Sequence, residues 1–473
     1  MEEETAATTS ILRRRPHVAL LCSPGVGHLI PFTELALRLA RLHGFSVTLL
    51  ANPLGSSAAI PPLLPVDGLP FRFVPLPDTP PDAGPPTQSS SPVPRIVRAV
   101  ACNLPHVRAA LDSAGPPVDA LVVDMFSVDA LDVARERRVP CYMFFTSPCT
   151  CLALLRHVPA LHEAVRGEFA VPVRPPGCAP VRPEDLLDSL RDRTGEAYAA
   201  ILRVTRRFGE VEGFLVNSFE ELEPGAFAAL NGGEARGPPV YPVGPLVRTG
   251  RVEPGEECLI RWLDRQPPGS VVFVSFGSGG TLSREQTREL ALGLEASGHR
   301  FLWAAKSPVE GRAHGAFFGG RNGPAAEYLP AGFAERTGGV GLAVARWAPQ
   351  AAVLGHAAVG GFVTHCGWNS ALESIASGVP MIAWPLYAEQ RMNAAMLADE
   401  AGVALRPQAG GGGLVGREEV ARAIRRLMEG QQGEALRTRT RLLRDAAARA
   451  VDEGGSSFRA LHDLANKWRL AAR

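Results

Sequence analysis

The sequence predicts an α/β protein made of two doubly wound, Rossmann-like domains that face one another across a cleft. Three observations predict this fold. First, a length of 473 residues suits two or three domains of ~100–200 residues each. Second, short apolar runs of strand length alternate with segments of helical spacing in both halves of the chain. Third, residues 237–255 are rich in glycine and proline, and the alternation starts afresh after them.

Five apolar runs predict the strands of the first half: residues 17–23, 45–51, 118–124, 141–146 and 214–217. Between the first two runs, residues 29–42 carry apolar side chains at helical spacing, and Gly44 ends that helix. A second helix follows residue 124 and reaches Arg138. Two proline-rich stretches, 75–94 and 171–184, are expected to be irregular, and the first of them is expected to border a ligand.

Five further runs predict the strands of the second half: residues 271–276, 299–305, 341–346, 360–364 and 380–384. The predicted helices are 283–297, 368–377, 386–400, 417–428, 438–451 and 458–470. The first of these begins with a capping box, in which Ser283 is followed three residues later by Gln286. We therefore expect one domain over residues 1–245, a linker over 246–255 and a second domain over 256–457. Ligands of such sheets bind outside the carboxyl ends of the strands, so the cleft is the expected site.

Composition excludes several classes of protein. Lys+Arg 49 against Asp+Glu 48 give a net charge of +1, so no strong field favours nucleic acid or an anionic membrane. No apolar run approaches the ~18 residues of a membrane span. Residues 1–15 are acidic first and basic afterwards, unlike a secretory signal, so we expect a cytoplasmic protein, and we expect it to be a monomer. The eight cysteines show no metal-ligand spacing, and we expect buried thiols and no metal.

His28 follows a glycine turn at the end of the first strand. Glycines at such a turn let a ligand approach closely and leave helix N–H groups free. An imidazole titrates near neutrality and suits a general base. The alternative is a histidine that only makes a structural hydrogen bond at the start of a helix. Because the turn lacks the third glycine of a dinucleotide fingerprint, a nicotinamide dehydrogenase is disfavoured.

Asp124 ends a predicted buried strand and so lies at the carboxyl edge of the same sheet. A histidine base needs a carboxylate on its second nitrogen, which fixes the tautomer and stabilises the cation. The alternative is a cap of the following helix. Both interpretations are open at this point.

Residues 347–390 concentrate unusual side chains at the junctions between elements. Trp347 follows a strand and could stack on a planar base. Residues 365–370 join a strand end to a helix start, where backbone N–H groups and the helix dipole favour a phosphate. Glu373 lies one turn further on, and Glu389 and Gln390 follow the next strand. Each residue alone is more often structural, but their recurrence on successive strand ends predicts a ligand site.

This segment resembles, without a gap, the signature box of the plant UDP-sugar glycosyltransferases. The similarity extends over SPGVGHLIPFTELALRLA, LVNSFEELEP, YPVGPL and VVFVSFGSGGTLS. Within that family, FGSGGTLSREQ, EYLPAGFAERT and WPLYAEQRMNA look like the branch of hydroquinone (arbutin-forming) and monolignol glucosyltransferases. The resemblance implies the GT-B architecture, in which the N-terminal half binds the acceptor and the C-terminal half the UDP-sugar. It also implies that residues 458–473 pack back on the first domain.

Residue by residue, the resemblance implies that His28 is the catalytic base and Asp124 its charge partner. It places Phe126 and Ala388, with His28, at the acceptor. It assigns uracil to Trp347 and Ala348, ribose to Gln350 and Glu373, and the diphosphate to Ser278, His365, Asn369 and Ser370. The hexose falls to Thr146, Trp368, Glu389 and Gln390, and Gly27 completes the donor-binding set.

The reaction implied is displacement at C1 of UDP-glucose by a phenolic oxygen, giving a β-glucoside without a metal or other cofactor. Alternatives are the same scaffold acting as a C-, N- or S-glycosyltransferase, and a non-catalytic protein that binds a UDP-sugar or a phenolic compound.

Overall fold

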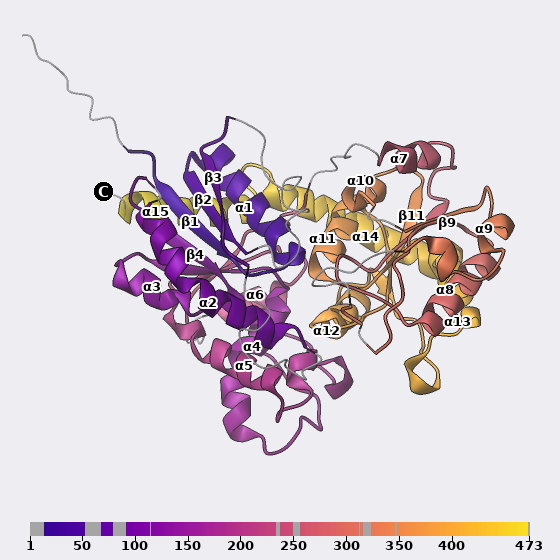
Figure 1. Ribbon diagram of the computed structural model, residues 1–473, viewed down its shortest axis with the longest axis horizontal. Helices are drawn as coiled ribbons and strands as arrows, with labels where there is room; N and C mark the ends of the chain where they lie inside the picture. Colours follow the sequence, from indigo (N-terminus) through magenta and orange to yellow (C-terminus); the bar gives the residue numbers. More distant parts are fainter. Residues whose placement is uncertain are drawn as a thin grey trace, which may run out of the picture.

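The computed structural model of the protein describes residues 14–52, 68–78, 91–113, 115–232, 237–248, 256–311, 313–315, 323–345 and 348–471. Two lobes lie side by side, with residues of the first half in one and most of the second half in the other (Figure 1). Each lobe contains one parallel sheet with helices on both faces, so the predicted fold class is confirmed. Trp347, most of the linker 246–255 and most of the stretch 75–94 lie outside the described residues.

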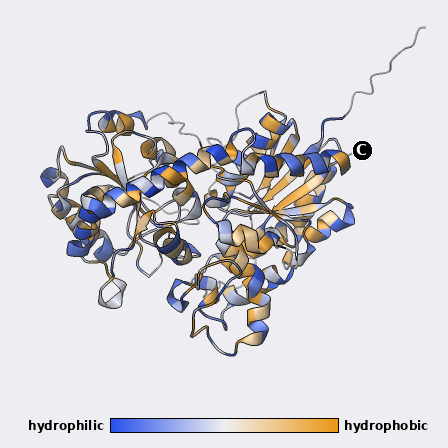
Figure 2. Cartoon of the chain, turned by 180° about the vertical axis from the view of Figure 1, so that it is seen from behind, coloured by the Kyte–Doolittle hydropathy of each residue, from blue (hydrophilic) through white to orange (hydrophobic). Residues whose placement is uncertain are grey.

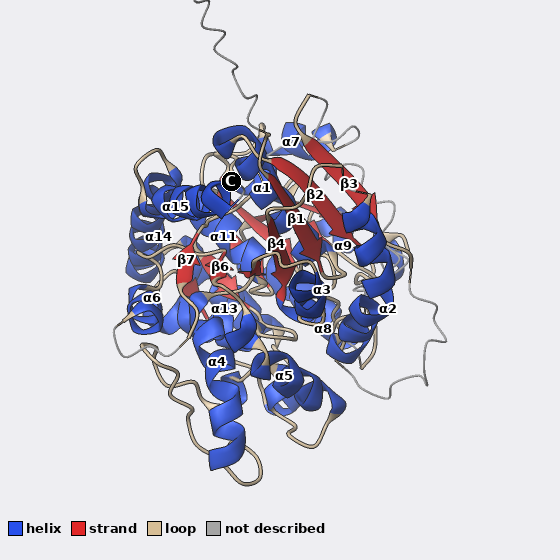
Figure 3. Ribbon diagram, turned by 90° about the vertical axis from the view of Figure 1, so that its left-hand side faces the viewer, coloured by secondary structure: helices blue, strands red, loops and turns tan. Residues whose placement is uncertain are grey.

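The N-terminal sheet has seven strands in the order β3-β2-β1-β4-β5-β6-β7. Its strands are β1 (His17–Cys22), β2 (Ser46–Ala51), β3 (Phe71–Pro75), β4 (Ala120–Asp124), β5 (Cys141–Phe145), β6 (Phe214–Val216) and β7 (Val240–Pro242). All residues of β1, β4 and β5 are buried, as expected of parallel strands covered on both faces. Figure 3 shows the twist of this sheet between its helical layers.

The helices of the N-terminal lobe are α1 (Val26–His43), α2 (Val93–Asp112), α3 (Ala130–Glu136), α4 (Cys149–Ala164), α5 (Glu196–Arg206) and α6 (Pro224–Asn231). A short 3-10 helix, Met125–Ser127, separates β4 from α3. Other single 3-10 turns are Pro183–Asp185, Asp188–Leu190 and Phe208–Glu210.

The C-terminal sheet has six parallel strands in the order β10-β9-β8-β11-β12-β13. They are β8 (Val271–Ser275), β9 (Arg300–Ala304), β10 (Gly341–Val344), β11 (Val359–Thr364), β12 (Met381–Ala383) and β13 (Ala404–Leu405). The order resembles that of the first sheet, because β11 lies beside β8 as β4 lies beside β1. In each sheet the chain adds three strands in one direction, then returns to the first of them and adds the rest in the other direction. Each sheet therefore has a switch point, between β1 and β4 in one and between β8 and β11 in the other.

The helices of the second half are α7 (Glu257–Leu263), α8 (Arg284–Ser297), α9 (Phe333–Arg336), α10 (Gln350–Leu354), α11 (Trp368–Ser377), α12 (Gln390–Ala395), α13 (Arg417–Met428), α14 (Gly430–Val451) and α15 (Ser456–Ala471). Half of the predicted capping box is present at α8. Ser283 Oγ accepts from the Gln286 N–H at 3.1 Å, but the Gln286 side chain bonds the backbone of Val415 and does not return to Ser283. Among the described residues, no helix combines the length and the apolar character that a membrane span requires.

The chain returns to the first lobe at its end. Viewed from behind, the two last helices run from one lobe to the other, α14 on the C-terminal lobe and α15 on the N-terminal one (Figure 2). Leu464 and Trp468 of α15 are at most 1% exposed and belong to the apolar cluster that also contains Phe32 and Phe45. This core is shared by segments more than 400 residues apart, which joins the end of the chain to its beginning.

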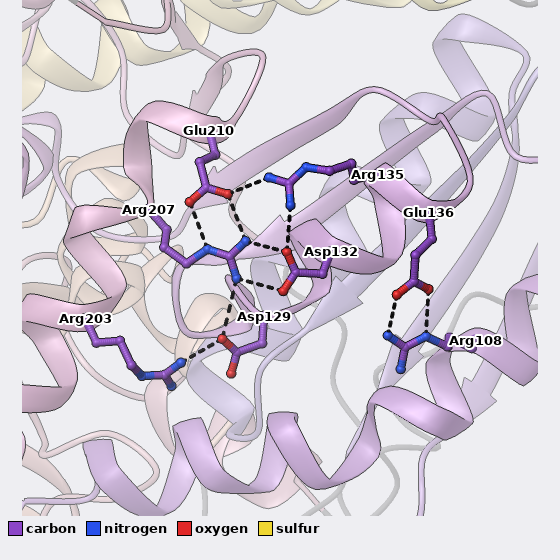
Figure 4. Close-up of polar contacts among 8 residues, drawn as sticks. All are labelled: Arg108, Asp129, Asp132, Arg135, Glu136, Arg203, Arg207 and Glu210. Carbon is purple, nitrogen blue, oxygen red and sulfur yellow. Dashed lines mark hydrogen bonds and ion pairs between the residues drawn. The ribbon is translucent and has the colours of Figure 1, made fainter.

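Ion pairs connect the helices on the outer face of the N-terminal lobe (Figure 4). Arg207 binds Asp132 of α3 at 2.8 Å and Glu210 at 2.8 Å, and Arg203 of α5 binds Asp129 at 2.7 Å. Arg108 of α2 binds Glu136 of α3 at 2.8 Å. The network holds α3, which follows β4 and Asp124 after one 3-10 turn, against α2 and α5.

Several predicted boundaries were wrong, for local reasons. The helix predicted over 386–400 begins at Gln390, because its side-chain Oε1 accepts the N–H groups of Leu386 and Tyr387 and Ala388 adopts φ 57. That helix continues as the π-helix Met396–Glu400. The helix predicted over 438–451 begins at Gly430, and the stretch 75–94 ends inside α2.

Candidate active site

Two catalytic candidates meet at the switch point of the N-terminal sheet. His28 lies in the first turn of α1, after the glycine turn that follows β1, and Asp124 is the last residue of β4. β1 and β4 are neighbours with Leu21 opposite Val123. The topology alone therefore brings two residues 96 positions apart to one edge of the sheet.

The two side chains form a hydrogen-bonded ion pair. His28 Nδ1 lies 2.8 Å from Asp124 Oδ2, and the Asp124 side chain is 0% exposed while that of His28 is 19% exposed. Thr146 Oγ1 lies 3.3 Å from the same nitrogen. A carboxylate on Nδ1 favours the tautomer with the proton there, which leaves Nε2 free to accept a proton. This is the arrangement of a positioned general base.

Asp124 satisfies both interpretations of its role at once. Its Oδ1 accepts the N–H of Phe126 at 3.1 Å and so caps the 3-10 helix, while Oδ2 binds the imidazole. One carboxylate oxygen is thus used for local structure and the other for His28. The structure thus shows both contacts, and the role of Asp124 as a charge partner stays a prediction.

The charges around His28 favour its protonated form. Burial lowers the pKa of His28, but the Asp124 and Glu389 carboxylates raise it, and the net result is a pKa above the ordinary 6.5. Burial also raises the pKa of Glu389, whose Oε1 accepts from Ser147 Oγ at 3.3 Å. The pair Glu389 and Ser147 joins the two lobes beside His28.

A cavity of ≈ 660 Å³ opens next to this pair. The ring of Phe126 lines it and meets the His28 ring edge-on, with centroids 5.7 Å apart. Ala388 and Tyr387 close it from the C-terminal lobe. Of the three residues predicted at an acceptor, Phe126 and Ala388 lie in its wall, and His28 lies behind Phe126 without lining it. Further lining residues come from the end of the stretch 75–94, from α4 and α5, and from the segment after β9, among them Val93, Cys151, Leu155, Ile201 and His314. The cavity is large enough for a small aromatic molecule.

The predicted donor residues cluster at the switch point of the C-terminal sheet, across from His28. Asn369 Nδ2 donates to the Gly27 carbonyl at 2.6 Å, a direct link between the start of α11 and the start of α1. Gln350 Nε2 donates to Ser370 Oγ at 2.8 Å and to Glu373 Oε2 at 2.7 Å. Three residues predicted to hold a nucleotide are therefore already bonded to one another.

Unpaired polar atoms mark this cluster as a ligand site. Gln350 Oε1, His365 Nδ1 and Asn369 Oδ1 are buried without a hydrogen-bond partner. Buried polar atoms without partners are rare and costly in folded proteins. Burial raises the pKa of Glu373 to about 7, although the hydrogen bond from Gln350 acts in the opposite direction. A polar ligand at these atoms would remove the cost.

His365 is held between two glycines. A Cβ atom added to Gly277 would lie 2.3 Å from His365 Nε2, and one added to Gly367 would lie 2.4 Å from it, so neither position has room for a side chain. Gly277 also has φ +67, which favours glycine. Burial, together with the charge of Lys306, lowers the pKa of His365 to about 3, so its imidazole is neutral. The glycine turn after β8, predicted from GSGG, is thus needed for the close approach of this ring.

The remaining predicted residues lie in or near the cluster. Trp368 is 3% exposed, and its indole N–H donates to the Asn217 carbonyl of the other lobe at 2.6 Å. Gln390 uses Oε1 for the loop before α12. Thr146 is buried beside His28, Ala348 is 4% exposed, and Ser278 is half-buried in the glycine turn.

Sequence reasoning missed three residues of the site: Ser147, Asp188 and Lys306. Lys306 follows β9, so its position after a strand of the same sheet was a usable signal. Asp188 binds Ala388 and Arg391 from a loop without any recognisable pattern. Across the described part of the chain, no group of three or more His, Cys, Asp or Glu is arranged to hold a metal ion.

Comparisons with known proteins agree with this geometry. Residues 260–452 match the family model described as UDP-glucoronosyl and UDP-glucosyl transferase. The chain is 45% identical to the hydroquinone glucosyltransferase of Rauvolfia serpentina, over 97% of this chain and 98% of that protein. UGT2 of Phytolacca americana, complexed with UDP-2fluoro-glucose and pterostilbene, has a TM-score of 0.86 at 44% identity, covering 96% of this chain and 99% of that chain. A Polygonum tinctorium UDP-glucosyltransferase capable of glucosylating indoxyl, in complex with 3,4-dichloroaniline, has a TM-score of 0.87 at 42% identity, covering 97% and 99%.

Proposed function

Because the chain belongs to the UDP-glucosyl transferase family, we propose that it moves glucose from UDP-glucose to a hydroxyl group of a small phenolic acceptor, with inversion at the anomeric carbon. The 45% identity to a hydroquinone glucosyltransferase, which extends over nearly the full length of both chains, confirms the resemblance to the hydroquinone glucosyltransferase branch. It also supports a UDP-glucose-dependent enzyme over a non-catalytic binding protein, as does the intact pair of His28 and Asp124.

The observation that carries the acceptor side of the proposal is the position of His28. Its ring meets that of Phe126, which lines the ≈ 660 Å³ cavity. Its Nδ1 binds Asp124 at 2.8 Å, so Nε2 is the nitrogen that can accept a proton. A phenol in the cavity would lose its proton to Nε2 as its oxygen attacks. Asp124 would stabilise the imidazolium that forms.

The donor side rests on the polar atoms of α10 and α11. Glu373 and Gln350 offer a carboxylate and an amide to a ribose diol. His365 Nδ1, which has no partner and can donate from a neutral imidazole, lies at the N-terminus of α11, where a phosphate is favoured. Displacement of UDP builds negative charge on the leaving diphosphate. Donors fixed in advance at that point lower the barrier.

The proposal is tested with UDP-glucose and hydroquinone as substrates. We expect a β-configured O-glucoside from the wild-type enzyme, identified by NMR and by its loss on acid hydrolysis. His28→Ala should lower kcat by ~10²–10⁴-fold, the usual contribution of a general base. Exposed His106→Ala is the matched control and should keep wild-type kcat. An α-configured product, or a product that survives acid as a C-glucoside does, would overturn the stated reaction.

A further inference from the structure

Lys306 lies at the donor site without an acidic partner. It follows β9, and its Nζ donates to the carbonyl of Ser278 at 2.6 Å and to that of Gly277. Among the described residues, no carboxylate acts on this ammonium, and burial alone shifts its pKa. Two carbonyl acceptors use two of its three N–H donors, and the third has no bond in the part of the chain that the structure describes.

The position of Lys306 relates it to the residues already assigned to the diphosphate. Its two carbonyl partners belong to the glycine turn after β8, which contacts the His365 ring through Gly277. His365 is the titratable side chain that faces the lysine, and the positive charge of Lys306 lowers the pKa of that imidazole. A cation, a glycine turn and a helix N-terminus thus surround one point at the switch of the C-terminal sheet.

We propose that Lys306 is a phosphate-binding residue, whose ammonium supplies the counter-charge for the diphosphate of UDP-glucose and for the leaving UDP. The inference rests on the proposed function, because it takes the nucleotide diphosphate as the ligand. It goes further by naming the fixed cation that balances the leaving group. A half-buried ammonium beside two carbonyls alone is short of negative charge, and the ligand supplies it.

This assignment couples nucleotide binding to a proton. Burial lowers the pKa of Lys306 to about 8 in the free protein. A bound diphosphate raises it again, because an adjacent anion favours the charged form. Near pH 8 the protein should therefore take up roughly half a proton for each UDP that binds. The terminal phosphate of UDP is already ionised at that pH, since such groups titrate near ~6.

The composition of the chain offers a matched control. Of its 49 Lys and Arg residues, only Lys306 and Lys467 are lysines. Lys467 is on α15 and donates to the Tyr241 hydroxyl at 2.8 Å, away from the donor site. Uptake of protons on UDP binding is measured by calorimetry in Tris and in HEPES, whose ionisation enthalpies differ, with uridine as the ligand that lacks phosphate.

We expect Lys306→Met to weaken UDP by ~10–100-fold, the range for a lost charge-assisted hydrogen bond, and to leave uridine within about twofold. Lys306→Arg should keep most of the UDP affinity and lose the proton uptake, because guanidinium does not titrate here. Lys467→Met should change neither quantity. Equal losses for uridine and UDP in Lys306→Met would instead show that Lys306 only supports the glycine turn.

A measurement on the wild-type chain covers the case in which the variants do not fold. Lysine labelled with ¹³C at Cε gives two side-chain signals, and Lys467→Met assigns them. The Lys306 signal should titrate near pH 8 without ligand and at higher pH with UDP. A signal that does not move with UDP overturns the inference although the proposed function stands. No UDP binding to the wild type overturns both.

Discussion

At the scale of single residues, Asp124 offers the sharpest test, because its two oxygens have different partners. Asn has one carbonyl oxygen and one NH₂ group. If the oxygen keeps the cap on Phe126, the NH₂ group faces His28 Nδ1 and selects the tautomer with its proton on Nε2. If the oxygen turns to His28, the NH₂ group meets the Phe126 N–H. No orientation of Asn keeps both the cap on Phe126 and the His28 tautomer that leaves Nε2 free to accept a proton.

We therefore expect Asp124→Asn to lower kcat by ~10²–10⁴-fold, since the comparable change in a protease triad costs ~10⁴-fold. A small loss of thermal stability should accompany it. Steady-state kinetics beside thermal melting measures both. Asp129→Asn is the control, because Asp129 accepts from Arg203 on the surface and touches no catalytic candidate. Wild-type kcat in a stable Asp124→Asn protein would leave Asp124 a structural residue.

The pH dependence of the reaction follows from the charges around His28. A base must be neutral to accept a proton, and Asp124 and Glu389 hold the pKa of His28 above 6.5. We expect kcat/KM to fall as the pH drops through that raised pKa. The Glu389→Gln variant lacks one of the two carboxylates that raise the pKa of His28, so the acid limb of its kcat/KM profile should move to lower pH. An acid limb that stays in place would separate Glu389 from the base.

At the scale of elements, the ion pairs of Figure 4 should matter for stability and not for chemistry. Arg207 is 18% exposed and joins Asp132 and Glu210, so its loss releases α3 from the neighbouring elements. We expect Arg207→Ala to lower the free energy of unfolding by about 1 kcal/mol, the upper end for a partly exposed pair. Urea unfolding measures it, and kcat should stay within about twofold. A large loss of kcat would mean that α3 positions Asp124.

The contact between α1 and α15 carries an acid-sensitive group. His43 is 4% exposed, and burial, followed by His462 and Arg469, lowers its pKa to about 4. The unfolded chain binds a proton at His43 below about pH 6.5 that the folded chain does not bind, so stability falls as the pH drops from there to about 4. We expect His43→Gln to flatten this part of the melting-temperature curve. Exposed His106→Gln should leave the slope unchanged.

At the scale of the whole molecule, the features that could be predicted from the sequence are those with a periodic apolar pattern or a local turn signal. Both sheets, the turn before His28 and the capped start of α8 follow from apolar spacing and glycine positions. Helices α2 and α4 and the strands β3, β7 and β13 were missed, because proline within or beside them, or their short length, hides the pattern. Helix α5 was missed although it contains no proline and its apolar residues follow helical spacing. Contacts between lobes, such as Asn369 with Gly27, depend on tertiary packing and have no local signal.

The two lobes are joined over the acceptor cavity by Asp188. Its backbone N–H donates to the Ala388 carbonyl at 3.1 Å, and its carboxylate accepts the Ala388 N–H at 2.9 Å and binds Arg391. Ala388 has φ 57, a conformation that costs free energy in a residue other than glycine. Asp188 thus fixes the wall of the cavity that comes from the other lobe.

We expect Asp188→Ala to raise the KM for the phenolic acceptor roughly tenfold, the size of a lost charged hydrogen bond, because Ala388 and Arg391 lose their anchor. The dissociation constant of UDP should change by less than about twofold, since the nucleotide residues lie on α10 and α11. Asp192→Ala is the matched control. Asp192 lines the same cavity, but its carboxylate binds its own loop, Thr194 at 3.0 Å and 2.7 Å and the backbone of Gly195. If both variants raise KM alike, negative charge in the cavity matters and the bridge does not. If only Asp188→Ala does so, the cavity depends on the junction of the lobes, and acceptor choice is then a property of the closed molecule.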